Sequence, residues 1–163
     1  MINAKNRFPS HNLDRNHLLS VARSFYPKKH LGQNFLIEPA QLLFIANALK
    51  LSADDVVLEI GPGLGFLTGY LSASGARIKA VELDAQCVSY LQSLELNGVS
   101  IAHGDFLQFD LSCLGDTPLK VVGNVPYQIT SAILAHLFGE IGHPAPWIDK
   151  ISTLVMTVQK ELV

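Results

Sequence analysis

Short apolar runs alternate with helix-like apolar patterns along most of the chain, and polar residues gather where each run ends. The run that starts at Val56 opens into a glycine-rich turn ending at Gly65, which is typical of a buried parallel strand followed by a tight loop. Further strands are predicted at 77–83, 99–102, 119–122 and 153–158, and helices from Pro39 and over 66–74, 85–94 and 130–138. This alternation predicts an α/β fold with a mostly parallel sheet, helices on both faces and a ligand crevice at the carboxyl ends of the strands.

Two segments outside the strands also carry a pattern. The helix that begins at Pro39 is amphipathic, and we expect its apolar face to pack in the core through Leu42, Leu43, Ile45, Ala46 and Leu49. The stretch around Pro144 and Pro146 is predicted to be a loop ahead of the last strand.

Length and composition favour a single globular domain, because 163 residues of which 48% are apolar can bury a sizeable core. No apolar run reaches the roughly 18 to 20 residues that span a bilayer, and no signal-peptide stretch is evident, so we expect a cytoplasmic protein without membrane contact. Two cysteines and six histidines without paired spacing give no basis for a disulfide framework or a metal site. We therefore expect a protein that holds no metal. We also expect a monomer, although no pattern in the sequence fixes the oligomeric state.

The charge is uneven although its net value is only −2. Residues 1–30 hold six of the twelve Lys and Arg residues and a single acid, Asp14. We interpret residues 1–27 as a basic arm, mostly disordered, with a short helix at 17–25. Such an arm is suited to binding the phosphates of a nucleic acid through counterion release, but a targeting peptide for an organelle has the same composition.

The glycine-rich turn favours a ligand over an ordinary turn. Gly61, Gly63 and Gly65 lack side chains where the chain turns sharply, so backbone amides can approach a polar ligand. Glu82 lies about 20 residues farther on, at the end of the second strand, where its carboxylate can accept hydrogen bonds from ribose hydroxyls. The dinucleotide pattern requires a third glycine where Phe66 stands, so the spacing favours S-adenosylmethionine.

The turn after the third strand contains Gly104, Asp105 and Phe106. Asp105 could accept a hydrogen bond from the amino group of adenine, and Phe106 could pack on the ring. The alternative is an aspartate that only stabilises a solvated turn.

The most specific signal is the sequence Asn124-Val125-Pro126-Tyr127 after the fourth strand. The amine of adenine is a weak nucleophile, and acceptors for both its hydrogens, the Asn124 side-chain oxygen and the Val125 carbonyl, would free its lone pair to attack a methyl sulfonium. Pro126 would stiffen the loop, and Tyr127 would offer a face for an unstacked base. The alternative is an Asn-x-Pro turn ahead of a helix.

Taken in order, six motifs closely resemble the ribosomal RNA adenine dimethyltransferases: Q-N-F-L at 33–36, E-I-G-P-G-L-G at 59–65, V-E-L-D at 81–84, G-D-F at 104–106, G-N-V-P-Y at 123–127 and Q-K-E at 159–161. The resemblance covers about residues 28–163. It implies a Rossmann-like methyltransferase fold that binds S-adenosylmethionine through Asn34, Leu36, Gly61, Glu82, Asp105 and Asn124. It also implies that residues 124–127 handle the target adenine, and that the substrate is two adjacent adenines near the 3′ end of small-subunit ribosomal RNA, in the immature small subunit.

Two further expectations follow from the resemblance. Members of this family continue beyond the fifth strand with more strands and a helical RNA-binding domain, so we expect residues 28–163 to be a partial catalytic domain that is inactive alone. Two other functions stay open: a large-subunit RNA adenine methyltransferase of the antibiotic-resistance type, and a non-catalytic assembly or transcription factor on the same fold.

Overall fold

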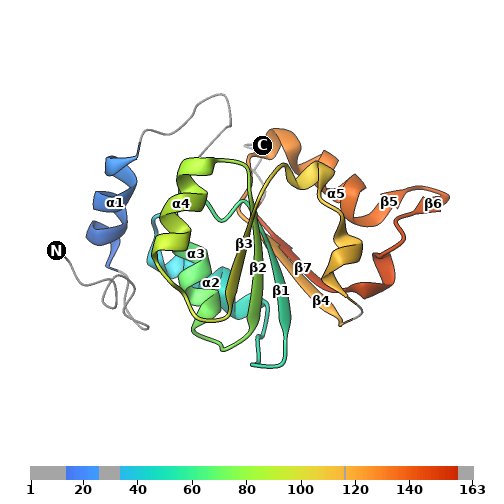
Figure 1. Cartoon of the computed structure of the whole chain (residues 1–163), viewed down its shortest axis with the longest axis horizontal. Helices are drawn as coiled ribbons and strands as arrows, with labels where there is room; N and C mark the ends of the chain where they lie inside the picture. The colour runs from blue at the N-terminus through green and yellow to red at the C-terminus, as the bar shows by residue number, and fades with distance from the viewer. Residues whose placement is uncertain (1–13, 26–33, 116, 158–163) are drawn as a thin grey trace, which may run out of the picture.

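The computed structural model describes residues 14–25, 34–115 and 117–157, and its main element is a sheet of five parallel strands. The strands lie in the order β3-β2-β1-β4-β7, so β1 is central. Their bounds are β1 Val56–Ile60, β2 Arg77–Glu82, β3 Val99–His103, β4 Leu119–Gly123 and β7 Ile151–Met156. Since all five run the same way, their carboxyl ends meet at one edge of the sheet (Figure 1).

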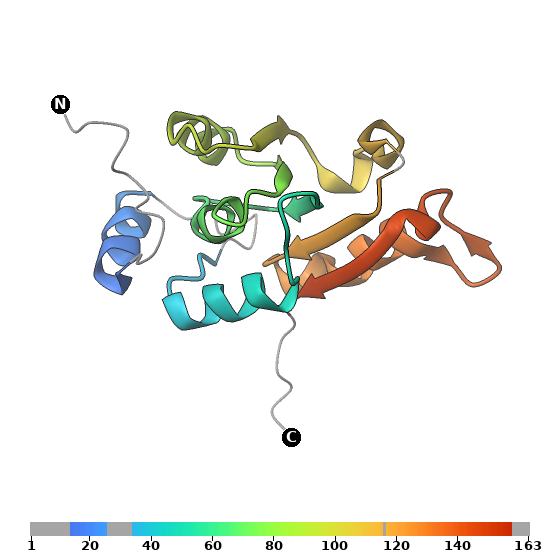
Figure 2. The same cartoon turned by 90° about the horizontal axis from the view of Figure 1, so that it is seen from below.

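Helices cover both faces of this sheet. Helices α1 to α4 lie on one side of the strands and α5 lies on the other, as both views show (Figures 1 and 2). The bounds are α1 Arg15–Ser24, α2 Pro39–Ala48, α3 Phe66–Ser72, α4 Ala85–Ser93 and α5 Thr130–Phe138. Short 3-10 turns occupy η3 Phe106–Gln108, η4 Leu111–Leu114, η5 Tyr127–Ile129 and η6 Ile148–Lys150. The predicted α/β class is confirmed, and the fold is Rossmann-like.

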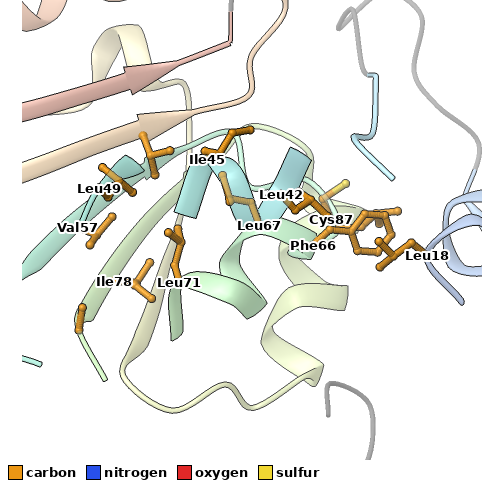
Figure 3. Packing of buried hydrophobic residues seen from close by; sticks show 13 residues of the cluster. Leu18, Leu42, Ile45, Leu49, Val57, Phe66, Leu67, Leu71, Ile78 and Cys87 are labelled. Carbon is orange, nitrogen blue, oxygen red and sulfur yellow. The ribbon is translucent and has the colours of Figure 1, made fainter. Parts of the chain in front are cut away.

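Every residue of β1 is buried, because each face of the strand packs against its own core. Val57 faces the core under α2 and α3, where Leu18, Leu42 and Leu71 are almost fully enclosed (Figure 3). Leu58 faces the opposite core with Ile133 and Leu137 of α5 and several residues of the 3-10 turns. Because successive side chains of a strand point to opposite faces, Glu59 lies on the same face as Val57.

The predicted strands and helices are present, with shifts of one to two residues at their ends, but one core expectation is wrong. Leu42, Ile45 and Leu49 are buried, whereas 48% of Leu43 is exposed and Ala46 is only half-buried. The buried residues are three and four positions apart and so share one helix face. Leu43 lies about 100° around the helix from Leu42 and faces outward.

A short hairpin, β5 Gly139–Glu140 and β6 His143–Pro144, stands where the sequence predicted only a proline-rich loop. Gly139 makes its tight start possible. It has a φ of +81°, and a Cβ there would collide with the carbonyl oxygen of His143. Two-residue strands carry too little alternation to be recognised in a sequence.

Helix α1 confirms the short helix predicted within the amino-terminal arm, although it begins two residues earlier than predicted. The Asp14 side chain caps it by accepting a hydrogen bond from the N–H of Asn16 at 3.3 Å. Leu18 is fully buried against the main core, and the Phe25 ring packs edge-on to Tyr90, with 5.0 Å between ring centroids. The arm therefore contributes to the core. Residues 1–13 and 26–27, which carry the rest of the predicted disorder, lie outside the described residues.

None of the helices in the described ranges is long and apolar enough to cross a membrane.

Candidate functional site

One cavity at the carboxyl edge of the sheet gathers nearly all the residues that the sequence singled out. Strand ends and the loops after them supply most of its wall, and residues 34–36 line it beside the glycine loop. The predicted residues that line it are Asn34, Leu36, Gly61, Gly63, Glu82, Asp105, Phe106, Asn124, Val125 and Pro126. Tyr127 does not line the cavity but follows its rim, with 47% of the residue exposed.

The glycine loop is held tightly on two sides. Gly61 and Gly63 have φ values of +64° and +57°, which glycine adopts without strain. A Cβ on Gly61 would lie 3.5 Å from Val125 Cγ1, and one on Gly63 would lie 3.2 Å from the Phe35 ring. The loop therefore packs directly against both the 124–127 segment and the 34–36 segment, which are far apart in the sequence.

Glu82 links the second strand to this loop. One carboxylate oxygen accepts a hydrogen bond from the N–H of Gly63 at 2.8 Å, and the other accepts one from the N–H of Asp84, also at 2.8 Å. The residue is 6% exposed. Each carboxylate oxygen has a second lone pair, so both can still accept from ribose hydroxyls. The sequence predicted a ligand role for Glu82 but gave no sign that its side chain also holds the glycine loop.

Asp105 and Phe106 lie where the third strand meets the cavity. Asp105 Oδ1 caps the 3-10 turn η3 by accepting from the N–H of Leu107 at 3.0 Å, which is the structural role that the sequence left as the alternative. The other oxygen is 3.4 Å from the Gln108 amide nitrogen, which donates to it. Phe106 is buried, and its ring packs edge-on to His136 with 5.2 Å between centroids. Both residues still contribute to the cavity wall.

Asn124 has a partner that sequence reasoning missed. The hydroxyl of Thr157 donates to Asn124 Oδ1 at 2.8 Å, and the Thr157 backbone N–H donates to the Gly123 carbonyl at 3.2 Å. Thr157 directly follows β7, and β7 lies beside β4, so the sheet order brings the two residues together. The contact fixes the orientation of the amide and leaves its oxygen one further lone pair.

The residues after Asn124 form one side of the cavity and its rim. Val125 is 6% exposed and packs in the core beneath α5. Pro126 leads into the 3-10 turn η5, where the Ile129 N–H donates to the Pro126 carbonyl at 3.2 Å. Tyr127 and Ile129, 47% and 39% exposed, place apolar surface beside the opening.

Glu59 is a second residue that the sequence did not single out as functional. It is 1% exposed, and it lines the cavity from β1. Burial among apolar neighbours raises the pKa of its carboxyl to about 8, and the negative charge of Glu82 adds to the effect. The hydroxyl of Thr68 in α3 acts on the Glu59 carboxyl and partly offsets this rise in pKa, although neither that hydroxyl nor Glu59 Oε2 makes a hydrogen bond of ordinary length. The signal in the sequence that could have singled out Glu59 is its place as the one acid in the apolar run 56–60.

The ionisable side chains among the described residues that line the cavity are all carboxyls: Glu59, Glu82 and Asp105. Such a lining suits a cationic ligand and disfavours the pyrophosphate of a dinucleotide. In the part of the chain that the structure describes, no group of three or more His, Cys, Asp or Glu residues is placed to hold a metal ion.

Comparison with known proteins matches residues 25–163 to the family described as ribosomal RNA adenine dimethylase. The chain belongs to this family. A curated relative from Myxococcus xanthus, the ribosomal RNA small subunit methyltransferase A, is 41% identical over 81% of this chain and 44% of its own length. The protein of the same name from Thermosynechococcus vestitus is 42% identical over 83% of this chain and 50% of its own. This family member thus spans about half the length of these relatives.

Solved structures agree with the family assignment. The 23S rRNA methyltransferase ErmE is 31% identical, covers 64% of this chain and 42% of its own, and superposes with a TM-score of 0.58. A dimethyladenosine transferase from Plasmodium falciparum is 26% identical, with 65% and 38% covered and a TM-score of 0.54. The dimethylase fold is therefore present in the described strands and helices.

Proposed function

We propose that the protein is a ribosomal RNA adenine N6,N6-dimethyltransferase, an enzyme that uses S-adenosylmethionine to dimethylate two adjacent adenines near the 3′ end of small-subunit RNA during ribosome biogenesis. The observation that carries the proposal is one cavity that joins the glycine loop to the Asn124-Val125-Pro126 segment in a member of the dimethylase family, with carboxyls as the ionisable groups among the described lining residues. The names of the curated relatives support the small-subunit target.

The cavity residues fit the methyl donor. Its adenosine would lie with ribose hydroxyls donating to Glu82 and the adenine amino group donating to Asp105, while Phe106 packs against the ring. Gly61 and Gly63 have no side chains to fill the space that the donor needs, and Asn34 and Leu36 would cover it. When bound, S-adenosylmethionine supplies an electrophilic methyl group on a positively charged sulfur.

The acceptor side of the proposal uses the segment after β4. Asn124 Oδ1 and the Val125 carbonyl would each accept one hydrogen of the adenine amine, which favours a tetrahedral nitrogen with a lone pair free to attack. Thr157 would hold the Asn124 amide in the orientation that presents this oxygen. Tyr127, exposed at the rim, would stack on the base once it has left the RNA helix.

A large-subunit target is the second candidate, and the likeness to ErmE favours it. One experiment separates the two targets. The protein is extended by the carboxyl-terminal half of the Myxococcus xanthus relative and incubated with immature small and large subunits. The methylated adenines are then mapped. Paired dimethyladenines near the 3′ end of the small-subunit RNA support the proposal, and a modified large-subunit adenine replaces it. No methylation of either, with the donor bound, favours a non-catalytic assembly or transcription factor.

The remaining expectations are also proposals. We propose that residues 28–163 form part of a catalytic unit and do not methylate RNA alone, because the chain covers about half of its relatives. We propose a cytoplasmic monomer whose partner is the immature small subunit. Methylation by residues 1–163 at the rate of the extended chain would contradict the first of these, and sedimentation of the extended chain tests the monomer.

A further inference from the structure

A histidine outside the cavity is bonded to the turn that forms part of the cavity wall. His136 lies in α5, is half-buried and is not one of the residues that line the cavity. Its Nε2 atom is 2.9 Å from the carbonyl oxygen of Phe109, which lies 27 positions earlier in the chain. A carbonyl oxygen can only accept a hydrogen bond, so the imidazole donates to it through Nε2–H.

The Phe109 carbonyl ends the short turn η3, which carries two residues of the cavity wall. The N–H of Phe109 donates to the Phe106 carbonyl at 3.0 Å, and the Asp105 side chain caps the start of the turn. A 3-10 turn of three residues has poor hydrogen-bond geometry of its own, so contacts from outside it decide how firmly it is held. The bond from His136 ties the end of this turn to α5.

Two aromatic rings pack against the same imidazole. The Phe106 ring lies edge-on to it, with 5.2 Å between the centroids and 83° between the planes. The Trp147 ring lies 5.5 Å from it, and the indole N–H donates to the His136 carbonyl at 3.1 Å. The imidazole is therefore held by residues from two other segments. Because Phe106 lines the cavity, the place of the imidazole also sets the place of the cavity wall.

We propose that His136 is a positioning residue for the adenine end of the methyl donor. It holds the 105–109 turn so that the Asp105 carboxylate and the Phe106 ring meet the base together. The inference rests on the proposed cofactor and on the place proposed for its adenine. Asp105 would select the base, because adenine has an amino group that donates to it, whereas hypoxanthine has a carbonyl oxygen there, which only accepts. A turn released from α5 would lose this selectivity as well as affinity.

Two ligands measure the selectivity on residues 1–163 themselves. S-adenosylhomocysteine carries adenine, and S-inosylhomocysteine differs from it only in carrying hypoxanthine. Isothermal calorimetry gives both affinities, and their ratio measures the selectivity for the base. The unmodified chain should bind the adenine ligand about 10- to 100-fold more tightly, since hypoxanthine loses a hydrogen bond to a charged group. A general loss of stability lowers both affinities equally and leaves the ratio unchanged.

Two variants separate the hydrogen bond from the ring. His136→Phe keeps an aromatic ring but cannot donate to the Phe109 carbonyl. It should lower both the affinity for S-adenosylhomocysteine and the selectivity about three- to tenfold. His136→Gln keeps a side-chain N–H donor and should restore most of both values. His143→Phe makes the same change at an exposed histidine of β6 and should alter neither.

A measurement on the unmodified chain needs no variant to fold. Nitrogen NMR of the imidazole shows which ring nitrogen carries a proton, and Nε2 of His136 should carry one. Binding of S-adenosylhomocysteine should shift the ring signals of His136, because its ring packs on the Phe106 ring that would meet the adenine. The ring signals of His143 should stay in place. An unprotonated Nε2, or His136 signals that do not move on binding, overturns the inference.

The outcomes separate this inference from the proposed function. Full selectivity in His136→Phe, or a loss that His136→Gln does not restore, overturns the role of His136 and leaves the cofactor in place. Equal affinity of the unmodified chain for the two ligands means that the adenine does not meet Asp105, which also overturns the inference and leaves the cofactor in place. If the folded chain, verified by circular dichroism, binds neither ligand, the proposed cofactor is wrong and the inference falls with it.

Discussion

The carboxylate of Glu82 accepts a hydrogen bond from the backbone N–H of Gly63, 19 residues earlier in the chain, at 2.8 Å. This contact ties the end of β2 to the glycine loop that follows β1. A residue proposed to bind the ribose therefore also holds the loop against which the ligand would lie. We therefore expect ligand binding and the shape of the loop to be coupled through this side chain.

Replacing Glu82 with Ala should weaken binding of S-adenosylmethionine by roughly ten- to a hundred-fold, because hydrogen bonds to a charged group are worth about 1.5 to 3 kcal/mol. Isothermal calorimetry on residues 1–163 measures the effect. The variant should also be less stable to urea, since the N–H groups of Gly63 and Asp84 lose their acceptors. The Glu140→Ala variant is the matched control. Unchanged affinity in Glu82→Ala would show that the ribose lies elsewhere.

Asn124 and Thr157 should act together in methyl transfer. In the chain extended to the length of its relatives, Asn124→Ala should abolish turnover while RNA binding changes little, because the side chain would act on the reacting amine. Thr157→Val, which keeps the shape and loses the hydroxyl, should lower kcat more than it raises KM, and Thr157→Ser should restore it. Steady-state kinetics on RNA check both residues. Equal rates for the Val and Ser variants would show that the hydroxyl does not orient Asn124.

Glu59 should make the protein less stable as pH rises. Its pKa is about 8 in the folded chain against an ordinary value of 4.5, so the unfolded chain loses a proton that the folded chain retains. The free energy of unfolding should therefore fall between about pH 4.5 and 8, by up to about 1.4 kcal/mol per pH unit, and level off on either side. Urea unfolding of the wild type and Glu59→Gln measures the difference. The variant should gain relative stability toward pH 8, and parallel curves for the two proteins would contradict the assignment.

Helix α1 should be structural. Leu18→Ala should cost about 2 to 5 kcal/mol of unfolding free energy, because it leaves a cavity in the main core. A test of RNA binding by the arm should therefore remove residues 1–13 and keep α1. If the arm binds phosphate, this deletion should lower RNA affinity in the extended chain and reduce its salt slope by about one, measured by filter binding. An unchanged slope would favour targeting or disorder for residues 1–13.

The sequence by itself determined the elements and the edge of the sheet at which the site lies. Apolar runs such as 56–60 and helix-like patterns such as 130–138 are local signals, and they placed each main strand and helix within one or two residues. Parallel strands have their carboxyl ends at one edge, so the polar residues after β1 to β4 had to converge. The position of Glu82, Asp105 and Asn124 around one cavity followed from that rule.

The tertiary structure alone decided which atoms those residues contact. Thr157 reaches Asn124 because β7 lies beside β4, and no local pattern states which strands are neighbours. Leu18 is buried because α1 packs against the main core, although the segment around it is polar and basic. In the sequence, Glu59 is one acid in an apolar strand. Only the packing of the neighbouring elements shows that it is almost fully buried and that its Oε2 makes no hydrogen bond of ordinary length. Local periodicity encodes which face a side chain takes, whereas hydrogen bonds and burial depend on residues that are distant in sequence and are brought close only by the sheet order.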